Sequence, residues 1–305
     1  MSVILKVRLM KNKALLIYAN EDMEKNKWFT DRLIALAGEH GIEMKLTSSE
    51  DVKIRFSAQA ANVGNGLINP AFVSLIESIA YVINRSRDAE ISKIFEGYGI
   101  PSFNNSDTVL MGNDKFLEYG FFKGLELPVM DTVCGDVSED EIPFNPPYVV
   151  KHRRGHGGSR VFAADSHEEA LEIMKGTPRT EWILQKMCDE PGCDMRLYIL
   201  GDKVLAGVLR KSEEDFRSNF SLGGKAELVT PDPDICEQAL KVSGLLGADY
   251  IGIDLIRDGG RYVFNEIEDA VGARMLYEVS ELDAAGLFME YIFEKTFQKN
   301  ENGIK

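Results

Sequence analysis

Residues 249–269 read DYIGIDLIRDGGRYVFNEIED, two apolar stretches joined by a glycine-containing turn. Both stretches have the composition of β-strands, so the segment predicts a hairpin. Successive side chains of a strand point to opposite faces. Glu266 and Glu268 are therefore expected to share one face, while Ile267 points into the core.

The length of the turn decides where Asp254 points. A three-residue loop over 258–260 pairs Arg257 with Arg261 and places Asp254 opposite Phe264, on the face of the two glutamates. A two-residue loop would place it on the other face. Three-residue hairpin loops with glycine in the left-handed position are common, so we expect the three-residue loop.

Three carboxylates on one face repel one another unless a cation lies between them. Asp254, Glu266 and Glu268 offer only oxygen ligands, which favours Mg²⁺, with Mn²⁺ as an alternative. A solvated acidic strand face is the simpler explanation of the same pattern. We interpret the three residues as a candidate metal site.

The composition around this hairpin is that of an ordinary globular protein. The 305 residues are 44% hydrophobic and 28% charged, which suits about two domains. Lys and Arg number 35 against 49 Asp and Glu, a net charge of −14. Such a charge argues against a nucleic-acid binder and against a polybasic membrane protein.

The sequence contains neither a targeting segment nor a metal-binding cysteine pattern. No apolar run approaches the ~20 residues that a membrane helix needs, and lysine and arginine interrupt the first 13 residues, unlike a signal peptide. The 4 cysteines form no CxxC pair, so neither a disulfide scaffold nor a structural zinc site is expected. We predict a cytoplasmic protein.

The two halves of the chain differ in their pattern. Strand-like and helix-like segments alternate over the first hundred residues, which predicts a parallel sheet. After an acidic, proline-rich stretch at 138–147, the pattern changes to antiparallel strands with turns. The expected strands of the first half are 13–19, 42–48 and 81–85, and its helices are 26–41, 71–80 and 88–99. Further helices are expected at 113–125, 167–176, 232–247, where Pro233 takes the first helical position, and 283–297.

Two loops carry candidate phosphate ligands. In PYVVKHRRGHGGSRVF, Lys151 ends a strand, and Gly155, Gly157 and Gly158 join it to the next one, as in a mobile lid. A simple Gly-rich turn is the alternative. In EDFRSNFSLGG at 214–224, one face carries arginine and asparagine donors, unless this segment is only a surface turn.

Taken together and in this order, these motifs resemble the ATP-grasp superfamily. The likeness is greatest to the RimK-like branch, which includes ribosomal-protein glutamate ligase, and extends more distantly to glutathione synthetase. It runs from about Tyr81 to Val279. It implies an α/β and α+β architecture: an N-terminal parallel-sheet domain (1–108), then a central subdomain with a glycine-rich lid (109–187) and a C-terminal subdomain with the metal site (188–305), which sandwich the nucleotide.

The resemblance also implies roles for individual residues. The nucleotide site would comprise Lys115, Lys151, Gly157, Gly158, Lys186, Met187, Asp194, Arg217, Ser218 and Asn219. The catalytic residues would be Arg210, Arg217 and Asn219, and the metal ligands Asp254, Glu266 and Glu268. ATP and Mg²⁺ are the implied cofactors.

The sequence departs from the family pattern at three places. Glu268 stands where the family usually has asparagine, which adds one negative charge to the metal site. The segment 269–272 reads DAVG in place of a Ser-Pro-Gly turn. Lys186 stands in the adenine-binding hinge where an acidic residue is common, which matters less because backbone groups make most adenine contacts.

The implied reaction is the ADP-forming joining of a carboxylate to an amine through an acyl phosphate. The expected partners are small-molecule or peptide carboxylates and amines, with neither nucleic acid nor membrane, and a homo-oligomer is allowed. The alternative is a catalytically silent ATP-binding regulatory protein of the same fold. A phosphotransferase or carboxylase is a third interpretation, although no biotin-related segment is present.

Overall fold

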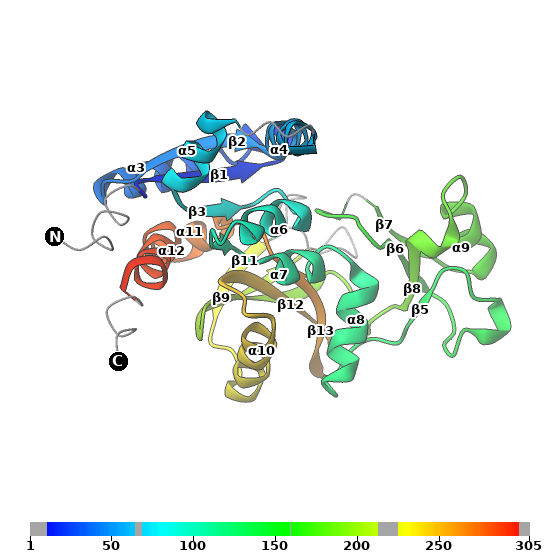
Figure 1. Ribbon diagram of the computed structural model, residues 1–305. Helices are drawn as coiled ribbons and strands as arrows, with labels where there is room; N and C mark the ends of the chain where they lie inside the picture. The colour runs from blue at the N-terminus through cyan, green and yellow to red at the C-terminus, as the bar shows by residue number, and fades with distance from the viewer. Residues whose placement is uncertain (1–10, 65–68, 159, 213–224, 299–305) are drawn as a thin grey trace. The chain divides into compact units, whose positions relative to one another are not determined.

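The computed structural model describes residues 11–64, 69–158, 160–212 and 225–298, which form two compact units (Figure 1). The first unit is drawn from residues 1–109, 247–250 and 282–305, and the second from residues 110–246 and 251–281. The three-part division with boundaries after 108 and 187 stays a prediction.

The first unit is built on a parallel four-stranded sheet with the order β2-β1-β3-β4. All residues of β3 are buried, as its nearly continuous apolar run predicts for a strand covered on both faces. The predicted parallel sheet is confirmed. Its strands are β1 (Lys13–Tyr18), β2 (Glu43–Ser48), β3 (Ile79–Asn84) and β4 (Ser102–Phe103).

Helices from distant parts of the chain pack on this sheet. Val52 and Phe95, from the helices α4 and α6, join Ile17 in one buried cluster. Phe293, near the end of the described chain, places its ring edge-on to Tyr81 of β3, with 6.4 Å between the ring centroids. The helices are α2 (Asn20–Met23), α3 (Lys27–Glu39), α4 (Ser49–Gly64), α5 (Pro70–Ser78), α6 (Ala89–Gly97) and α12 (Ala284–Phe293), with a π-helical turn at Glu294–Gln298.

The second unit contains two sheets that carry the candidate site. The five-stranded sheet has the order β11-β10-β9-β12-β13, with β9 (Cys193–Leu200), β10 (Lys203–Lys211), β11 (Lys225–Val229), β12 (Tyr250–Asp258) and β13 (Arg261–Glu268). The four-stranded sheet has the order β5-β8-β6-β7, with β5 (Thr132–Cys134), β6 (Tyr148–His152), β7 (Val161–Ala164) and β8 (Trp182–Lys186). The predicted change to antiparallel pairing is confirmed.

The helices of this region begin at residues that the sequence marks. Asp114 caps α8 (Lys115–Gly124) by accepting hydrogen bonds from the Phe116 and Leu117 N–H groups at 3.1 and 3.4 Å, which fixes Lys115 at the helix start. Pro233 begins α10 (Pro233–Leu246), as predicted. The other helices are α7 (Ser106–Met111), α9 (His167–Ile173) and α11 (Arg274–Val279), with 3₁₀ turns at Glu139–Glu141 and Arg179–Glu181.

The turn of the β12–β13 hairpin gives a stability prediction. Gly260 has a φ of 75°, a conformation that costs a residue with a Cβ roughly 1–2 kcal/mol. Gly260→Ala should therefore lower the free energy of unfolding by about that amount in urea titration. Gly244→Ala is the matched control, because Gly244 is exposed within α10 and nothing lies within 4 Å of an added Cβ. Gly244→Ala should raise the free energy of unfolding by ~0.5–1 kcal/mol. Equal effects of Gly260→Ala and Gly244→Ala would contradict the prediction.

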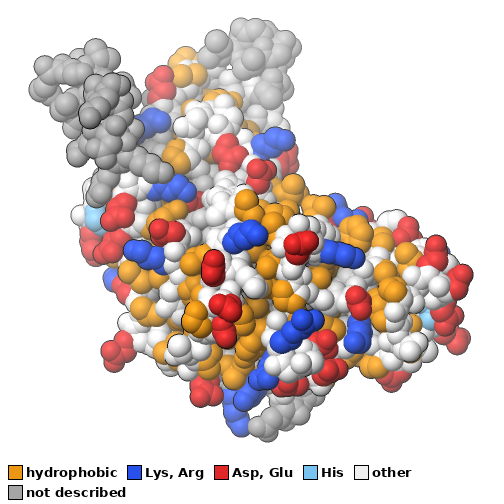
Figure 2. All heavy atoms as spheres, turned by 90° about the horizontal axis from the view of Figure 1, so that it is seen from below, with side chains coloured by type: hydrophobic (Ala, Val, Ile, Leu, Met, Phe, Trp, Pro, Cys, Tyr) orange, Lys and Arg blue, Asp and Glu red, His pale blue; other side chains and the backbone are white. Residues whose placement is uncertain are grey.

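The described surface agrees with the charge balance of the sequence. On the face shown in Figure 2, acidic and basic side chains are interspersed rather than grouped by sign.

Across the part of the chain that the structure describes, none of the helices has the length and apolarity needed to cross a membrane.

Candidate active site

The expected three-residue loop of the β12–β13 hairpin is wrong. Asp258 pairs with Arg261, so the loop consists of Gly259 and Gly260 alone. Both glycines have positive φ values, 59° and 75°, as a two-residue type I′ turn requires. On a regular ladder this shorter loop would place Asp254 on the face opposite to the two glutamates.

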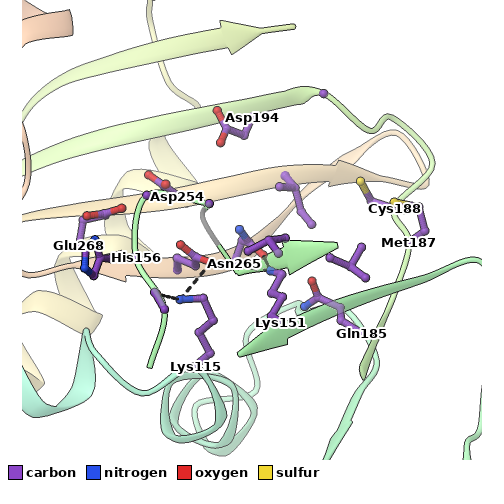
Figure 3. Close-up of a pocket in the computed structure, with 18 of the residues that line it drawn as sticks. Lys115, Lys151, His156, Gln185, Met187, Cys188, Asp194, Asp254, Asn265 and Glu268 are labelled. Carbon is purple, nitrogen blue, oxygen red and sulfur yellow. Dashed lines mark hydrogen bonds and ion pairs between the residues drawn. The ribbon is translucent and has the colours of Figure 1, made fainter. Parts of the chain in front are cut away.

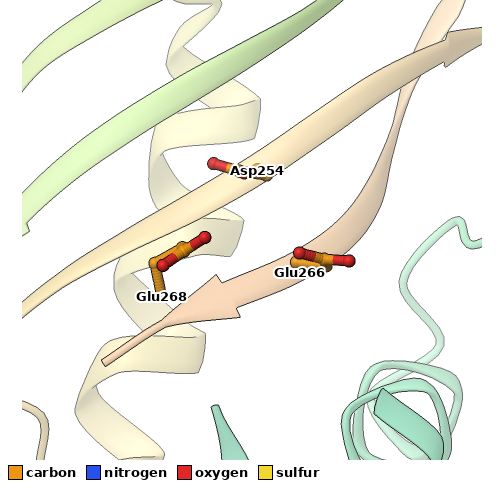
Figure 4. Close-up of side chains that lie close together, drawn as sticks. All are labelled: Asp254, Glu266 and Glu268. Atoms are coloured by element: carbon orange, nitrogen blue, oxygen red, sulfur yellow. The ribbon is translucent and has the colours of Figure 1, made fainter. Parts of the chain in front are cut away.

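A β-bulge brings the three carboxylates back to one face. The register shifts between Asp254 and Leu255, so that Asn265 is the extra residue on β13 and Glu266 lies directly opposite Asp254. Glu268 follows two residues later on the same face. Figure 4 shows the three carboxylates side by side, and their ligand oxygens lie within 4.8 Å of one another.

The geometry of these carboxylates fits a hard divalent cation. Oxygens bound to one Mg²⁺ at about 2.1 Å lie no more than about 4.2 Å apart, so only small movements are needed. Asp254 is buried, whereas the side chains of Glu266 and Glu268 are 23% and 32% exposed and have room to rotate. Each carboxylate oxygen has two lone pairs, which lets one oxygen serve a protein donor and a cation together.

Two arginines hold Asp254 in place. The Nε and Nη2 atoms of Arg196 each donate to one oxygen of Asp254 at 2.6 Å, and Arg210 Nη2 donates to Oδ2 at 2.7 Å. Arg210 also makes a two-bond ion pair with Asp194. Burial alone would raise the pKa of Asp254, but the two guanidinium groups lower it below its ordinary value. Asp254 is therefore held as a carboxylate.

Two lysines face Glu266 from different elements. The Nζ atoms of Lys115, on α8, and Lys151, on β6, lie 3.7 and 3.8 Å from Glu266 Oε1. Lys151 also donates to the Tyr119 hydroxyl at 2.9 Å and to Asn265 Oδ1 at 3.0 Å. Figure 3 shows both lysines pointing into the pocket that Asp254 lines.

The lysines differ in how their surroundings shift their pKa values. Burial lowers the pKa of Lys151 below its ordinary value. Burial acts in the same direction on Lys115, but the charges of Glu266 and Glu118 outweigh it and raise the pKa of Lys115. Lys115 is therefore held as a cation beside the carboxylates of the candidate metal site.

Glu118 ties the helix that carries Lys115 to the strand that carries the glutamates. Its carboxylate is buried and accepts a hydrogen bond from the Ile267 N–H at 2.8 Å. Burial raises the pKa of Glu118 well above its ordinary value. Because Ile267 lies between Glu266 and Glu268, this bond fixes α8 relative to both of them.

The family profile of the RimK-like ATP-grasp domain matches residues 135–292, more than half of the chain. The chain belongs to the RimK-like ATP-grasp family. The predicted family and enzyme class, a ligase that forms carbon–nitrogen bonds, are confirmed.

Relatives of this RimK-like chain align with most of its length. A probable alpha-L-glutamate ligase of Xanthomonas campestris pv. campestris (strain B100) is 28% identical over 276 residues, covering 86% of this chain and 94% of the relative. An uncharacterised protein of Mycoplasma genitalium is 29% identical over 294 residues, covering 95% and 96% of the two chains.

Solved structures share the fold. The D-alanine–D-alanine ligase of Bacillus anthracis, complexed with ATP, has a TM-score of 0.70 at 13% identity, with 95% of this chain and 98% of that chain covered. The ATP-grasp ligase PsnB, complexed with a minimal precursor, has a TM-score of 0.65 at 14% identity, with 94% and 100% covered. The predicted ATP-grasp fold is confirmed.

The structure brings most of the predicted nucleotide-site residues to one pocket. The predicted nucleotide-site residues that line this pocket are Lys115, Lys151, Gly157, Gly158, Met187 and Asp194. Lys186 instead lines a second pocket with Phe144 and Pro147, and its N–H donates to the Asp131 carbonyl at 2.9 Å. Arg210 is buried between Asp194 and Asp254. Arg217, Ser218 and Asn219 lie outside the described residues.

Three residues of the site are missing from the sequence-based prediction. Arg196 is two residues after Asp194 on β9, a spacing that predicts a shared face and gave a usable signal. Glu118 follows Lys115 by three positions on α8, so it lies on the same side of the helix. Asn265 gave no usable signal, because nothing local marks it as the residue of a bulge.

The glycine-rich loop 153–158 is attached to the start of α8. Arg153 pairs with Asp114 through two hydrogen bonds of 3.0 and 2.8 Å, and Lys115 Nζ donates to the Gly155 carbonyl at 2.6 Å. Gly157 and Gly158, at the tip, have φ values of 63° and 74°. The base of this loop is therefore anchored while its glycine tip borders the pocket.

We expect this loop to act as a lid and to become more ordered when nucleotide binds. Bound ATP with Mg²⁺ offers an anion to the basic loop, so the amides of 156–158 should gain protection in hydrogen exchange. The Arg153 amide, already bonded to the Glu181 carbonyl at 2.8 Å, should be protected in both states. The strand β8 is the internal control, and hydrogen exchange of its amides should not change when nucleotide is added. Equal exchange at the tip with and without nucleotide would identify the loop as a rigid turn.

Proposed function

We propose that the chain is an ATP-dependent, ADP-forming ligase that joins a carboxylate to an amine through an acyl phosphate. The observation that carries the proposal is the position of Lys115 and Lys151, 3.7 and 3.8 Å from Glu266 in the pocket where three carboxylates converge. Such a pocket suits the triphosphate of ATP with its cation, because both signs of charge face the same space.

Each residue would have a defined task in this reaction. Asp254, Glu266 and Glu268 would hold Mg²⁺, which when bound neutralises phosphate charge and aligns the phosphoryl group. Lys115 and Lys151 would bind phosphate oxygens. We assign phosphate contacts also to Arg217, with Ser218 and Asn219, as the family resemblance implies.

The reaction needs no covalent enzyme intermediate. The substrate carboxylate attacks the γ-phosphorus of ATP, and ADP leaves. The amine then attacks the acyl carbonyl, and phosphate leaves with the amide formed. Because an acyl phosphate hydrolyses in water, the lid over 153–158 would exclude solvent before the first step. Positioning and charge neutralisation therefore account for catalysis.

The hinge after β8 would bind adenine through backbone groups. Met187 lines the pocket and is the residue we assign to this contact. Lys186 would contribute only its carbonyl, since its N–H already donates to the Asp131 carbonyl. Asp194 would reach the ribose only by sharing its carboxylate with Arg210.

For the substrates we propose an amino acid, a peptide or a protein tail, and L-glutamate is the first amine to test. The probable alpha-L-glutamate ligases among the relatives support glutamate. PsnB has been solved in complex with a minimal precursor and with a precursor peptide, which supports including peptide carboxylates in the test. Cytoplasmic location and a homo-oligomer stay predictions.

Product analysis tests this function. The protein is incubated with ATP, Mg²⁺, L-glutamate and a panel of amino acids and short peptides, and ADP, phosphate and product mass are measured. An amide formed together with ADP and phosphate supports the ligase. A phosphorylated product would indicate a phosphotransferase. ATP binding without turnover on any panel member would favour the regulatory alternative.

Lys151 gives a binding prediction that needs no substrate. Lys151→Met keeps an apolar stem of similar length and removes the charge, so ADP affinity measured by calorimetry should fall by about tenfold or more. Lys203→Met, an exposed lysine on β10, is the control and should bind ADP normally. Unchanged ADP affinity in a folded Lys151→Met protein would remove Lys151 from the phosphate site.

A further inference from the structure

Three polar side chains beside the pocket form a closed triangle of hydrogen bonds. Lys151 Nζ donates to the Tyr119 hydroxyl at 2.9 Å and to Asn265 Oδ1 at 3.0 Å. The Tyr119 hydroxyl in turn donates to the same oxygen of Asn265 at 3.3 Å. Lys151 lies on β6, Tyr119 on α8 and Asn265 on β13. The ammonium group is therefore held by two elements other than its own strand.

The triangle leaves one N–H group of Lys151 for the pocket. An ammonium group has three N–H donors, and the oxygens of Tyr119 and Asn265 accept two of them. Glu266 Oε1 lies 3.8 Å from the Nζ atom, which is beyond the length of a hydrogen bond. Among the described residues, nothing accepts the third N–H at hydrogen-bond length, so a ligand in the pocket could do so.

Tyr119 and Asn265 fix the direction of the ammonium group without cancelling its charge. A carboxylate in either place would also hold Lys151, but it would offset the positive charge that attracts a phosphate. A hydroxyl and an amide oxygen are neutral. A lysine stem is flexible and loses conformational entropy when a ligand fixes it. Here the stem is fixed beforehand, so this loss would not reduce the affinity for the ligand.

The bulge of β13 brings Asn265 into the triangle. Consecutive residues of a regular strand point to opposite faces, yet Asn265 and Glu266 both line the pocket, and Asn265 lies beside Lys151 (Figure 3). The register shift between Asp254 and Leu255 allows this arrangement. One irregularity of the strand therefore supplies both a candidate metal ligand and an acceptor for the lysine.

Building on the proposed nucleotide site, we infer that Tyr119 and Asn265 are positioning residues that preset Lys151 for a phosphate group of the nucleotide. They hold two N–H groups of the ammonium and leave the third for a phosphate oxygen. Both residues act through Lys151 and need no contact with the nucleotide. The simpler explanation, that they only satisfy a buried cation, would affect the stability of the protein and not its affinity for nucleotide.

A double-mutant cycle on nucleotide affinity tests this role without relying on turnover. The dissociation constant of ADP in the presence of Mg²⁺ is measured by calorimetry for the wild type, Tyr119→Phe, Lys151→Met and the double variant. Tyr119→Phe should weaken ADP binding about three- to tenfold, the loss expected for one hydrogen bond. In the Lys151→Met background, the same change should alter the dissociation constant by less than about twofold.

Two results of this cycle would overturn the positioning role. Equal losses in both backgrounds would mean that Tyr119 affects the site independently of Lys151. Unchanged ADP affinity of Tyr119→Phe would mean that its hydroxyl group only satisfies the buried lysine. Tyr119→Phe removes a single oxygen atom and keeps the packing of the ring, so we expect a folded protein. Thermal unfolding of each variant checks this.

Asn265→Leu tests the second acceptor, because it removes the amide and keeps a side chain of similar size without a change of charge. It should weaken ADP binding about threefold or more with Lys151 present and by less than about twofold in the Lys151→Met background. Equal losses in the two backgrounds would remove Asn265 from the positioning role. If Asn265→Leu does not fold, Asn265→Ala replaces it with the same expectation.

The control and the choice of readout keep this inference apart from the proposed function. Tyr291→Phe is the matched control, because it removes a tyrosine hydroxyl that donates at 2.9 Å to Asp249 in the first unit, and it should leave ADP affinity unchanged. If no substrate supports ligation but the cycle shows the coupling, the proposed reaction fails and the positioning role stands. If ligation occurs but Tyr119→Phe binds ADP normally, the positioning role fails alone.

Discussion

Glu266→Gln is expected to abolish ATP-dependent turnover while leaving the protein folded. Glu266 lies directly opposite Asp254 and within 4 Å of both Lys115 and Lys151, so in the proposed site its charge would serve both the cation and the lysines. Losing a charged ligand removes several kcal/mol of transition-state stabilisation, and about 4 kcal/mol corresponds to roughly 10³-fold in rate. ADP release in the substrate assay measures the effect.

The control for this substitution is Glu227→Gln, which changes the same chemistry at an exposed position on β11 of the same sheet. It should keep the activity of the wild type. Thermal unfolding of both variants checks that neither has lost its fold. Because Glu266 is partly exposed, its substitution should shift the melting temperature only slightly. Nearly normal turnover by folded Glu266→Gln protein would contradict its assignment as a metal ligand.

Arg210→Met is expected to have the largest effect on stability. Arg210 is buried and neutralises two buried carboxylates, Asp194 and Asp254. Its removal leaves Asp194 without this partner and Asp254 with Arg196 alone. Breaking a buried ion pair by removing one partner costs about 3–5 kcal/mol, a large fraction of the stability of a typical domain.

Urea unfolding measures this loss for the second unit. Arg261→Met is the control, because Arg261 is exposed at the start of β13, and it should change the free energy of unfolding by less than about 0.5 kcal/mol. An Arg210→Met protein as stable as the control would mean that water enters and solvates the two carboxylates. The ion-pair network would then contribute little to the fold.

Local patterns were sufficient to predict the two kinds of sheet and most of the helices. Buried apolar runs separated by helical repeats identified the parallel sheet, and Pro233 marked the start of α10. The helix α4 was missed because Val52, Ile54 and Phe56 in its sequence, SEDVKIRFSAQAANVG, alternate with polar residues, a spacing typical of a strand. The short strands β5 and β11 were missed as well, since three to five residues carry too little periodicity to be read.

The three carboxylates of the candidate site were predicted, but the strand pairing that brings them together was not. Convergence of the three carboxylates was expected from a longer loop, whereas a two-residue loop with a bulge at Asn265 produces it. Bulges depend on packing on both faces of the hairpin, and no single residue signals them. The contact of Arg196 with Asp254 joins β9 to β12, strands that are neighbours in the sheet although more than fifty residues separate the paired side chains.

The position of Glu266 between two lysines also predicts how ligands would cooperate. If phosphate oxygens take over Lys115 and Lys151 in the proposed site, Glu266 would lose its lysine partners and become available to a cation. A cation on Glu266 would likewise release the lysines for phosphate. Each ligand would thereby raise the affinity of the other by the same factor, as thermodynamic linkage requires. Free Mg²⁺ and free nucleotide should each bind weakly alone and tightly together, so the enzyme would respond to the concentration of their complex.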